Sequence, residues 1–320
     1  MKTHQRIASL VLLFSFVLTA SSFAQQRERP DFEQMDITKD IAYAATDNPR
    51  QCLDLYLPRV RDDEEPLPVL VYIHGGAWRA GDKRGGGFRL ARFVAEGKYA
   101  GISVGYRLTG EAKWPAQLHD CKAAIRWIRA NAEKHNLDAE KIAVWGTSAG
   151  GHLVSCLGTM NDDEALEGDL GEHDDQSSRV ACVINYYGPS NLLTMDDHKS
   201  QIRHNAPNSP ESLLIGGPIQ QNKEKTRTAC SLFYVTKDDA PHLIVHGTND
   251  RLVPYPQSEV FDKALDDAGV PSTLIKMDGG GHGFRSEELD RRVEKFLAKH
   301  LQGKEADISD QPIKVEPRRR

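Results

Sequence analysis

The sequence predicts an α/β fold with a mostly parallel central sheet and helices on both faces. Continuous apolar runs such as Leu67–Ile73 and Ala100–Val104 are typical of strands buried on both faces. Between such runs lie longer amphipathic segments; in 115–135, apolar residues recur at spacings of three and four, as in a helix. Strands that alternate with helices favour a parallel sheet that is covered on both sides.

The predicted elements follow one another within a single domain at 41–302. An early, half-exposed strand is expected at Cys52–Leu57, where apolar residues alternate up to Pro58. Further strands are expected at 142–145, 180–186, 242–246 and 272–277, and further helices at 149–157, 258–268 and 289–301. We expect a loose lead-in at 25–40 and a disordered tail at 303–320, because the tail lacks apolar periodicity.

Two polar stretches interrupt this alternation. Residues 161–175 are dense in Asp and Glu but follow no ordered ligand loop, so a solvated loop is expected there rather than a calcium site. Residues 195–230 are polar, with scattered prolines, and lie between two predicted core strands. A substrate-covering insertion could be placed in this second stretch.

The N-terminus predicts export. Lys2 and Arg6 give a basic start, an apolar run follows, and Ser22-Phe23-Ala24 supplies the small residues that a signal peptidase reads. We expect a signal peptide at 1–24, cleaved after Ala24, and a secreted or periplasmic protein. The apolar run is shorter than the roughly 20 residues of a membrane span, so no integral span is expected after cleavage. A retained N-terminal anchor is the alternative.

Composition and charge narrow the function. The chain is 39% hydrophobic and 27% charged, which is ordinary for a globular protein with a real core. A formal net charge of −5 argues against nucleic acid as a partner, since phosphate binding favours a basic surface. Five cysteines cannot all pair within one chain, and three lie in apolar runs, so buried thiols are expected, although one disulfide is allowed. No spacing resembles a zinc site.

The pentapeptide Gly146-Thr147-Ser148-Ala149-Gly150 matches the pattern Gly-x-Ser-x-Gly. It follows a predicted strand and precedes a predicted helix. This context favours a sharp turn that presents Ser148 as a nucleophile, with glycines that let strand and helix approach closely. By itself the pattern also fits an ordinary glycine-rich turn.

A second motif, His74-Gly75-Gly76-Ala77-Trp78, directly follows the buried strand that ends at Ile73. Successive glycines allow backbone N–H groups to point into a cavity, where such donors stabilise the oxyanion of a tetrahedral intermediate. The N–H of Ala149 would supply a further donor. We expect His74 to shape the loop rather than to act as a base.

Asp250 and His282 each follow a predicted strand. Asp250 lies in the loop His246–Pro254, at the carboxyl end of a strand, and His282 is surrounded by glycines. Catalytic residues of open parallel sheets collect at that edge. Asp278 and Asp239 are competing acids, but Asp278 is very close in sequence to His282, and Asp239 precedes its strand.

The order Ser148, Asp250, His282 along the chain predicts the catalytic triad of a serine hydrolase. In this hypothesis His282 accepts the Ser148 proton, and Asp250 holds the imidazole in the correct tautomer. The mechanism requires no metal and no cofactor.

These motifs resemble those of the α/β-hydrolase superfamily, and within it the bacterial esterases and lipases that carry His-Gly-Gly-x-Trp. This branch includes acetyl xylan and feruloyl esterases and carboxylesterases similar to hormone-sensitive lipase. The likeness runs from about residue 53 to residue 301 and includes Trp114-Pro115-Ala116-Gln117. It implies the α/β-hydrolase fold and an oxyanion hole formed by Gly75, Gly76 and Ala149.

The resemblance also implies a substrate class. An exported serine esterase of this kind would act on a small-molecule ester or on an esterified polysaccharide of the cell wall, removing acetyl or feruloyl groups. Trp78, Trp114 and Phe284 could line an acyl pocket. A general short-chain carboxylesterase or lipase and a non-catalytic binding protein on the same fold remain alternatives, and an arylformamidase or a peptidase fits less well. The oligomeric state stays open.

Overall fold

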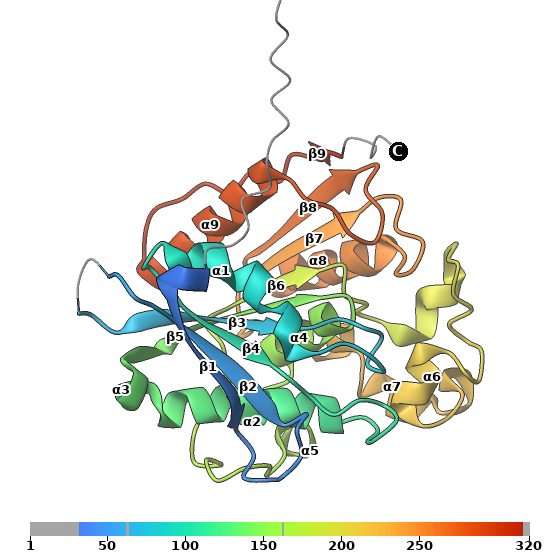
Figure 1. The fold of residues 1–320 in the computed structure, drawn as a ribbon. Coiled ribbons are helices and arrows are strands. Elements are labelled where there is room, and N and C mark those ends of the chain that lie inside the picture. Colours follow the sequence, from blue (N-terminus) through green and yellow to red (C-terminus); the bar gives the residue numbers. More distant parts are fainter. Residues whose placement is uncertain (1–31, 62–63, 162, 316–320) are drawn as a thin grey trace, which may run out of the picture.

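Nine strands form one sheet in a computed structural model that describes residues 32–61, 64–161 and 163–315. The strands are β1 (Met35–Ala42), β2 (Cys52–Pro58), β3 (Leu67–Ile73), β4 (Ala100–Val104), β5 (Leu137–Thr147), β6 (Cys182–Tyr186), β7 (His242–Gly247), β8 (Ser272–Asp278) and β9 (Ile313–Lys314). Their order across the sheet is β1-β2-β4-β3-β5-β6-β7-β8-β9 (Figure 1). β2 pairs antiparallel with β1 and β4, and every other pair is parallel. The predicted signal peptide, 1–24, lies outside the described residues.

Helices cover both faces of the sheet, which confirms the predicted fold class. On one face lie α1 (Gly87–Ala95) and α9 (Glu287–Gln302), and on the other α2 (Ala116–Ala130), α4 (Ala149–Thr159) and α8 (Pro256–Ala268). Shorter helices are α3 (Ala132–His135), α5 (Glu164–Glu167), α6 (Pro210–Ile215) and α7 (Lys223–Arg227), and 3₁₀ turns occur at Phe32–Gln34, Lys83–Gly85, Leu192–Asp197, Ile219–Gln221 and Ser231–Tyr234.

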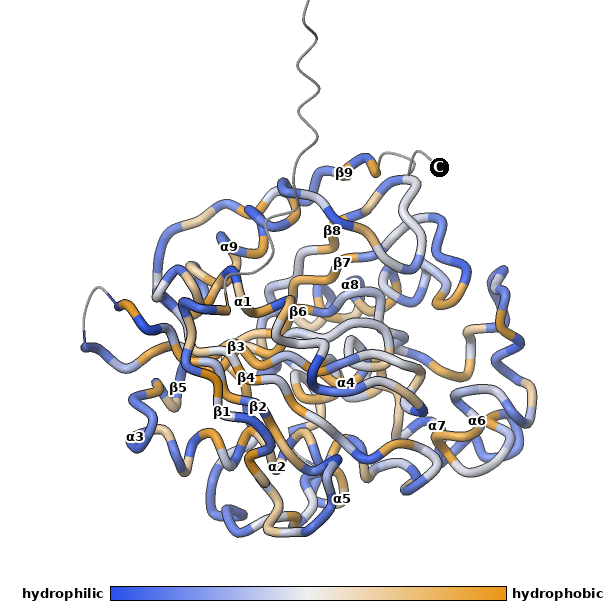
Figure 2. Tube along the Cα trace, viewed as in Figure 1, coloured by the Kyte–Doolittle hydropathy of each residue, from blue (hydrophilic) through white to orange (hydrophobic). Residues whose placement is uncertain are grey.

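The apolar run at 142–145, in the central strand β5, does not alternate because the strand is covered on both faces there. Ile142 and Val144 face the cluster beneath α2 and α4, whereas Ala143 and Trp145 face the cluster beneath α1 and α9. Both faces are therefore buried, as the continuous apolar runs predict. Figure 2 shows the same hydrophobic stretches along the central strands.

The predicted lead-in is corrected at its C-terminal part. Residues 35–40, expected to be loose, belong to β1, which pairs antiparallel with β2. Met35 is buried, whereas most of the strand is exposed or half-buried. An edge strand with so few buried side chains carries almost no apolar pattern, which is why the sequence does not reveal it.

The predicted disordered tail is also corrected. Residues 303–315 run beside the sheet, where β9 adds a short parallel pair to the edge of β8. Arg292 of α9 holds this segment by donating hydrogen bonds to the carbonyl oxygens of Ser309 and Gln311, at 2.9 and 2.6 Å. The segment is thus ordered by backbone contacts and by the buried Ile313 rather than by a periodic apolar face.

Three buried histidines make stability depend on pH. Burial lowers the pKa of His74, His152 and His242 to about 4. In the unfolded chain these imidazoles take up protons below a pH of about 6.5, so the unfolded state binds more protons between these two values. We therefore expect the free energy of unfolding to fall as pH decreases from 6.5 to 4, by at most about 1.4 kcal/mol per pH unit for each histidine.

Urea unfolding at several pH values, with His242→Gln beside wild type, measures this effect. The variant should lose part of the pH slope, and a control His198→Gln, at an exposed position, should keep it. Equal slopes in wild type and His242→Gln would contradict the buried, neutral state of His242.

Candidate active site

Ser148 lies at a sharp turn between β5 and α4. Its backbone has φ 56° and ψ −120°, a conformation that non-glycine residues seldom adopt. A Cβ on Gly146 would come within 2.1 Å of the Gly150 carbonyl oxygen, and a Cβ on Gly150 would come equally close to that of Ile73. Any larger residue would push the helix away from the strand, so the two glycines of the motif permit the turn.

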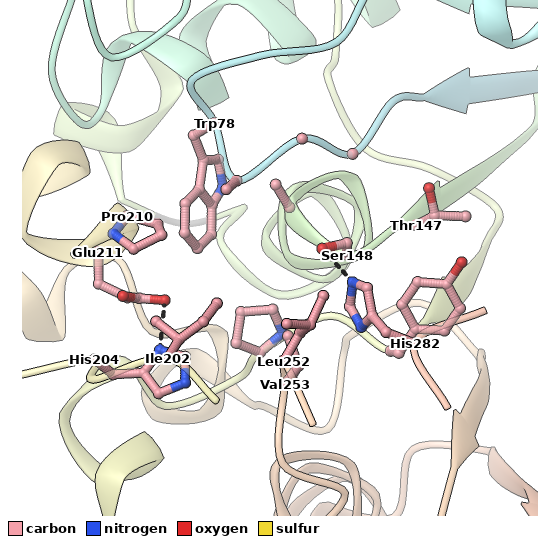
Figure 3. Close-up of a pocket in the computed structure, with 16 residues that line it drawn as sticks. Trp78, Thr147, Ser148, Ile202, His204, Pro210, Glu211, Leu252, Val253 and His282 are labelled. Atoms are coloured by element: carbon pink, nitrogen blue, oxygen red, sulfur yellow. Dashed lines mark hydrogen bonds and ion pairs between the residues drawn. The ribbon is translucent and has the colours of Figure 1, made fainter. Parts of the chain in front are cut away.

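His282 joins the other two residues of the predicted triad. Its Nδ1 lies 2.7 Å from Asp250 Oδ2. Its Nε2 lies 2.9 Å from Ser148 Oγ, a contact that Figure 3 shows as a dashed line. One neutral tautomer satisfies both contacts, because Nδ1–H donates to the carboxylate while Nε2 accepts from the hydroxyl. The arrangement directs the Ser148 proton toward His282.

Asp250 is buried and held from several sides. Its Oδ1 accepts hydrogen bonds from the backbone N–H groups of Leu252 and Val253, at 2.8 and 3.1 Å. Its Oδ2 lies 3.2 Å from His246 Nε2 as well as against His282. Burial by itself raises the pKa of Asp250, but the hydrogen bonds from the two histidines outweigh it and hold the pKa well below its usual range. A carboxylate at this position is therefore ionised at neutral pH.

The loop after β3 brings Gly75 and Gly76 to the same place as Ala149. Gly76 has φ 120°, and a Cβ there would lie 2.1 Å from the Ala80 carbonyl oxygen, so only glycine fits without strain. Ala149 is the first residue of α4, where backbone N–H groups have no partner within the helix. These three residues border the pocket next to Ser148, as an oxyanion hole would require.

His74 shapes this loop. Its ring stacks on Tyr106, with ring centres 4.2 Å apart, and its Nδ1 lies 2.7 Å from the Gly75 carbonyl oxygen. The Tyr106 hydroxyl in turn donates to the His74 carbonyl oxygen at 2.9 Å. All three contacts involve only Gly75 and Tyr106, and it is His282 that reaches Ser148.

Trp78 and His152 connect the loop to the rest of the site. Trp78 Nε1 donates to His152 Nδ1 at 3.2 Å, and His152 Nε2 donates to the Ala229 carbonyl oxygen at 2.7 Å. A neutral imidazole fits this pair of contacts, in agreement with its lowered pKa. His152 thereby ties together the loop after β3, helix α4 and the segment 195–230.

A cavity of about 530 Å³ opens beside Ser148 and His282. Its lining comes from the loop after β3, the turn at Ser148, the loops after β6, β7 and β8, and the segment 195–230. The lining residues are Gly75, Gly76, Ala77, Trp78, Thr147, Ser148, Ala149, Tyr187, Pro189, Ile202, His204, Pro210, Glu211, Leu252, Val253 and His282.

Two predicted pocket aromatics lie elsewhere. Phe284 is not among the lining residues; it is buried against the rings of Tyr186 and Tyr187, in the core on the α9 face. Trp114 is also buried, and its Nε1 donates to Thr228 Oγ1 at 3.0 Å. Both side chains serve packing instead, and Trp78 is the predicted aromatic that lines the pocket.

Sequence reasoning missed several residues of the pocket wall. Tyr187 directly follows β6, and its ring centre lies 4.6 Å from that of His282. The rule that placed Asp250 after a strand could have found Tyr187 too. By contrast, Ile202, His204 and Glu211 lie in an irregular segment that carries no periodic signal.

The described residues also bear on the predictions about metal ligands and cysteines. Within the described ranges, no three His, Cys, Asp or Glu side chains gather as metal ligands would. All five cysteines fall in those ranges and are buried as free thiols, so the predicted buried thiols are confirmed. Of the helices that the structure describes, none has the length and apolar character to cross a membrane.

A family model described as BD-FAE matches residues 53–265, about two thirds of the chain. The chain belongs to the BD-FAE family. This is an esterase family with the α/β-hydrolase fold, so membership confirms the predicted resemblance. The part of this chain that matches the family model contains Ser148 and Asp250, and His282 lies after it.

Several individual relatives of this BD-FAE member are also esterases by name. Esterase LipC of Mycobacterium tuberculosis is 33% identical over 74% of this chain and 58% of its own length. Among solved structures, a truncated carbohydrate esterase from gut microbiota superimposes with a TM-score of 0.75 at 30% identity, over 86% of this chain and all of that one. A bifunctional GH43-CE protein of Bacteroides eggerthii superimposes with a TM-score of 0.75 at 35% identity. The match covers 83% of this chain and 35% of that one. The chain spans less than two thirds of the length of LipC.

Proposed function

We propose that the protein is a serine hydrolase of carboxylic esters that works through an acyl-enzyme. The observation that carries this proposal is the unbroken hydrogen-bond chain from Asp250 through His282 to Ser148 at the wall of a pocket. Nucleophile and base are within hydrogen-bonding reach, and a buried carboxylate orients the base. Membership in an esterase family supports the same reaction.

In the proposed mechanism, Ser148 Oγ attacks the ester carbonyl carbon while His282 Nε2 takes its proton. The negative charge that develops on the carbonyl oxygen is stabilised by the backbone N–H groups of Gly75, Gly76 and Ala149. The intermediate collapses as His282 gives the proton to the departing alcohol. Water then attacks the acyl-enzyme, gives a proton to His282, and the acid leaves as Ser148 regains its hydrogen.

We further propose that the esters are acetyl or feruloyl groups on cell-wall polysaccharides. The similarity to a carbohydrate esterase and to a GH43-CE protein supports this substrate class. The predicted export of the protein agrees with it, since such polymers lie outside the cytoplasm. A general short-chain carboxylesterase is the second candidate, favoured by the similarity to LipC. A non-catalytic binding protein has no need of three aligned triad side chains.

Hydrolysis of two sets of esters by the wild-type protein tests this function. One set is acetylated xylan and methyl ferulate, and the other is p-nitrophenyl acetate, butyrate and octanoate. We expect hydrolysis of p-nitrophenyl acetate and release of acetate or ferulate from the first set. Hydrolysis confined to the p-nitrophenyl esters would favour the general carboxylesterase, and inert protein would contradict both.

A further inference from the structure

The wall of the pocket contains a buried, hydrogen-bonded pair of side chains that the proposed mechanism does not use. His204 and Glu211, from the segment 195–230, both line the cavity, and their side chains are only 1% and 3% exposed. His204 Nδ1 donates to Glu211 Oε1 at 2.9 Å. Figure 3 shows the pair across the pocket from Ser148 and His282.

The second carboxylate oxygen of Glu211 is unsatisfied. Glu211 Oε2 is buried and finds no hydrogen-bond donor in the described part of the chain. Ile202, Pro210 and Trp78 line the same pocket, and the first two of these side chains offer no donor. The indole N–H of Trp78 is already given to His152. A buried carboxylate oxygen without a hydrogen bond lowers the stability of a folded protein, and most such atoms have a hydrogen-bond partner.

Glu211 is also held firmly in place. His204 Nε2 lies 3.1 Å from Ser200 Oγ, which in turn lies 3.1 Å from the carbonyl oxygen of Arg251. Arg251 directly follows Asp250 in the sequence. The acceptor is therefore fixed relative to the residues that would perform the reaction, as a specificity site requires.

We propose that Glu211, positioned by His204, accepts a hydrogen bond from a hydroxyl group of the substrate, and so selects esters of polyhydroxylated alcohols such as sugars. This inference rests on the proposed ester hydrolysis. Glu211 Oε2 is the one carboxylate oxygen of this side chain without a hydrogen bond, and a substrate hydroxyl group supplies one O–H donor for it. An ammonium group carries three donors and would leave two of them facing apolar side chains. Trp78 in the same wall suits the apolar C–H face of a sugar ring.

The test compares two acetyl esters that differ in hydroxyl groups: a monoacetylated methyl β-xyloside and cyclohexyl acetate. The quantity measured is the ratio of their kcat/KM values. For Glu211→Met, which keeps the length of the side chain but removes the acceptor, we expect this ratio to fall roughly 10- to 100-fold, as for a lost hydrogen bond to a charged group. Glu211→Gln, which keeps a neutral acceptor, should give a smaller fall in the same direction.

A matched control variant completes the design. Glu224→Met makes the same substitution at an exposed position of the segment 195–230, outside the pocket lining, and should leave the ratio within about threefold. If Glu211→Met does not fold, as judged by its thermal transition, Glu211→Gln carries the test. An unchanged ratio in the folded Glu211 variants would overturn the inference while ester hydrolysis stands.

Two other results would also overturn it. Wild-type protein that cleaves neither ester would remove the proposed function and this inference together. A preference for trans-2-aminocyclohexyl acetate over the xyloside, abolished in Glu211→Gln, would assign the acceptor to an ammonium group instead.

Discussion

Ser148→Ala should lower kcat for p-nitrophenyl acetate by about 10⁶-fold, the loss expected when a triad nucleophile is removed. The methyl group of alanine cannot form the acyl-enzyme, so only the pocket and the oxyanion donors would remain to act on the ester. Steady-state hydrolysis at pH 7.5, with the thermal transition measured in parallel, checks the effect.

Ser155→Ala is a suitable control for this variant. Ser155 lies on the same helix, α4, but it is buried against Asn185, which donates to its Oγ at 2.8 Å. It lies outside the pocket lining, so its loss should affect stability more than rate. Activity of Ser148→Ala within tenfold of wild type would mean that another group performs the attack.

Asp250→Asn should lower kcat by about 10⁴-fold, the second largest effect that we expect. An amide at this position would present N–H where His282 Nδ1–H now donates, which favours the wrong tautomer of the imidazole. The N–H donors of Leu252 and Val253 would still find the amide oxygen, so the loop should keep its shape. The kcat for p-nitrophenyl acetate measures the loss.

The competing acid Asp278 provides the matched comparison. It ends β8, is exposed, and lies four positions before His282 in the sequence. Asp278→Asn should change kcat less than about threefold, because Asp250 is the carboxylate that contacts His282. A larger loss in Asp278→Asn than in Asp250→Asn would reverse the assignment of the acid.

The sequence was most informative where one constraint dictates one residue type. The turn at Ser148 needs glycine at 146 and 150. A Cβ at position 146 would collide with the backbone of α4, and a Cβ at position 150 would collide with the backbone of β3. Such a motif can be recognised from the local sequence alone, without knowing which residues pack against it. The buried parallel strands can also be predicted from local sequence, since both of their faces must be apolar.

The sequence was least informative where contacts are made by backbone or by single side chains. β1 and β9 are edge strands with one buried anchor each, Met35 and Ile313, and neither leaves a pattern. Phe284 follows His282 closely, but its side chain turns into the core on the α9 face, and local sequence does not encode that direction. His204 and Glu211 meet only through the irregular path of the segment 195–230. The sequence predicts that a substrate-covering insertion could be placed there, but it does not show which side chains of the segment enter the pocket.

Peptide mass spectrometry of protein inactivated with diethyl p-nitrophenyl phosphate tests the central claim most directly. This reagent phosphorylates a serine that an adjacent base has activated. We predict that loss of esterase activity parallels the appearance of one diethylphosphoryl group on the peptide that contains Ser148. The same peptide should stay unmodified in His282→Ala, in which the base is missing. Inactivation with the adduct on another residue, or full esterase activity in protein modified at Ser148, would contradict the account.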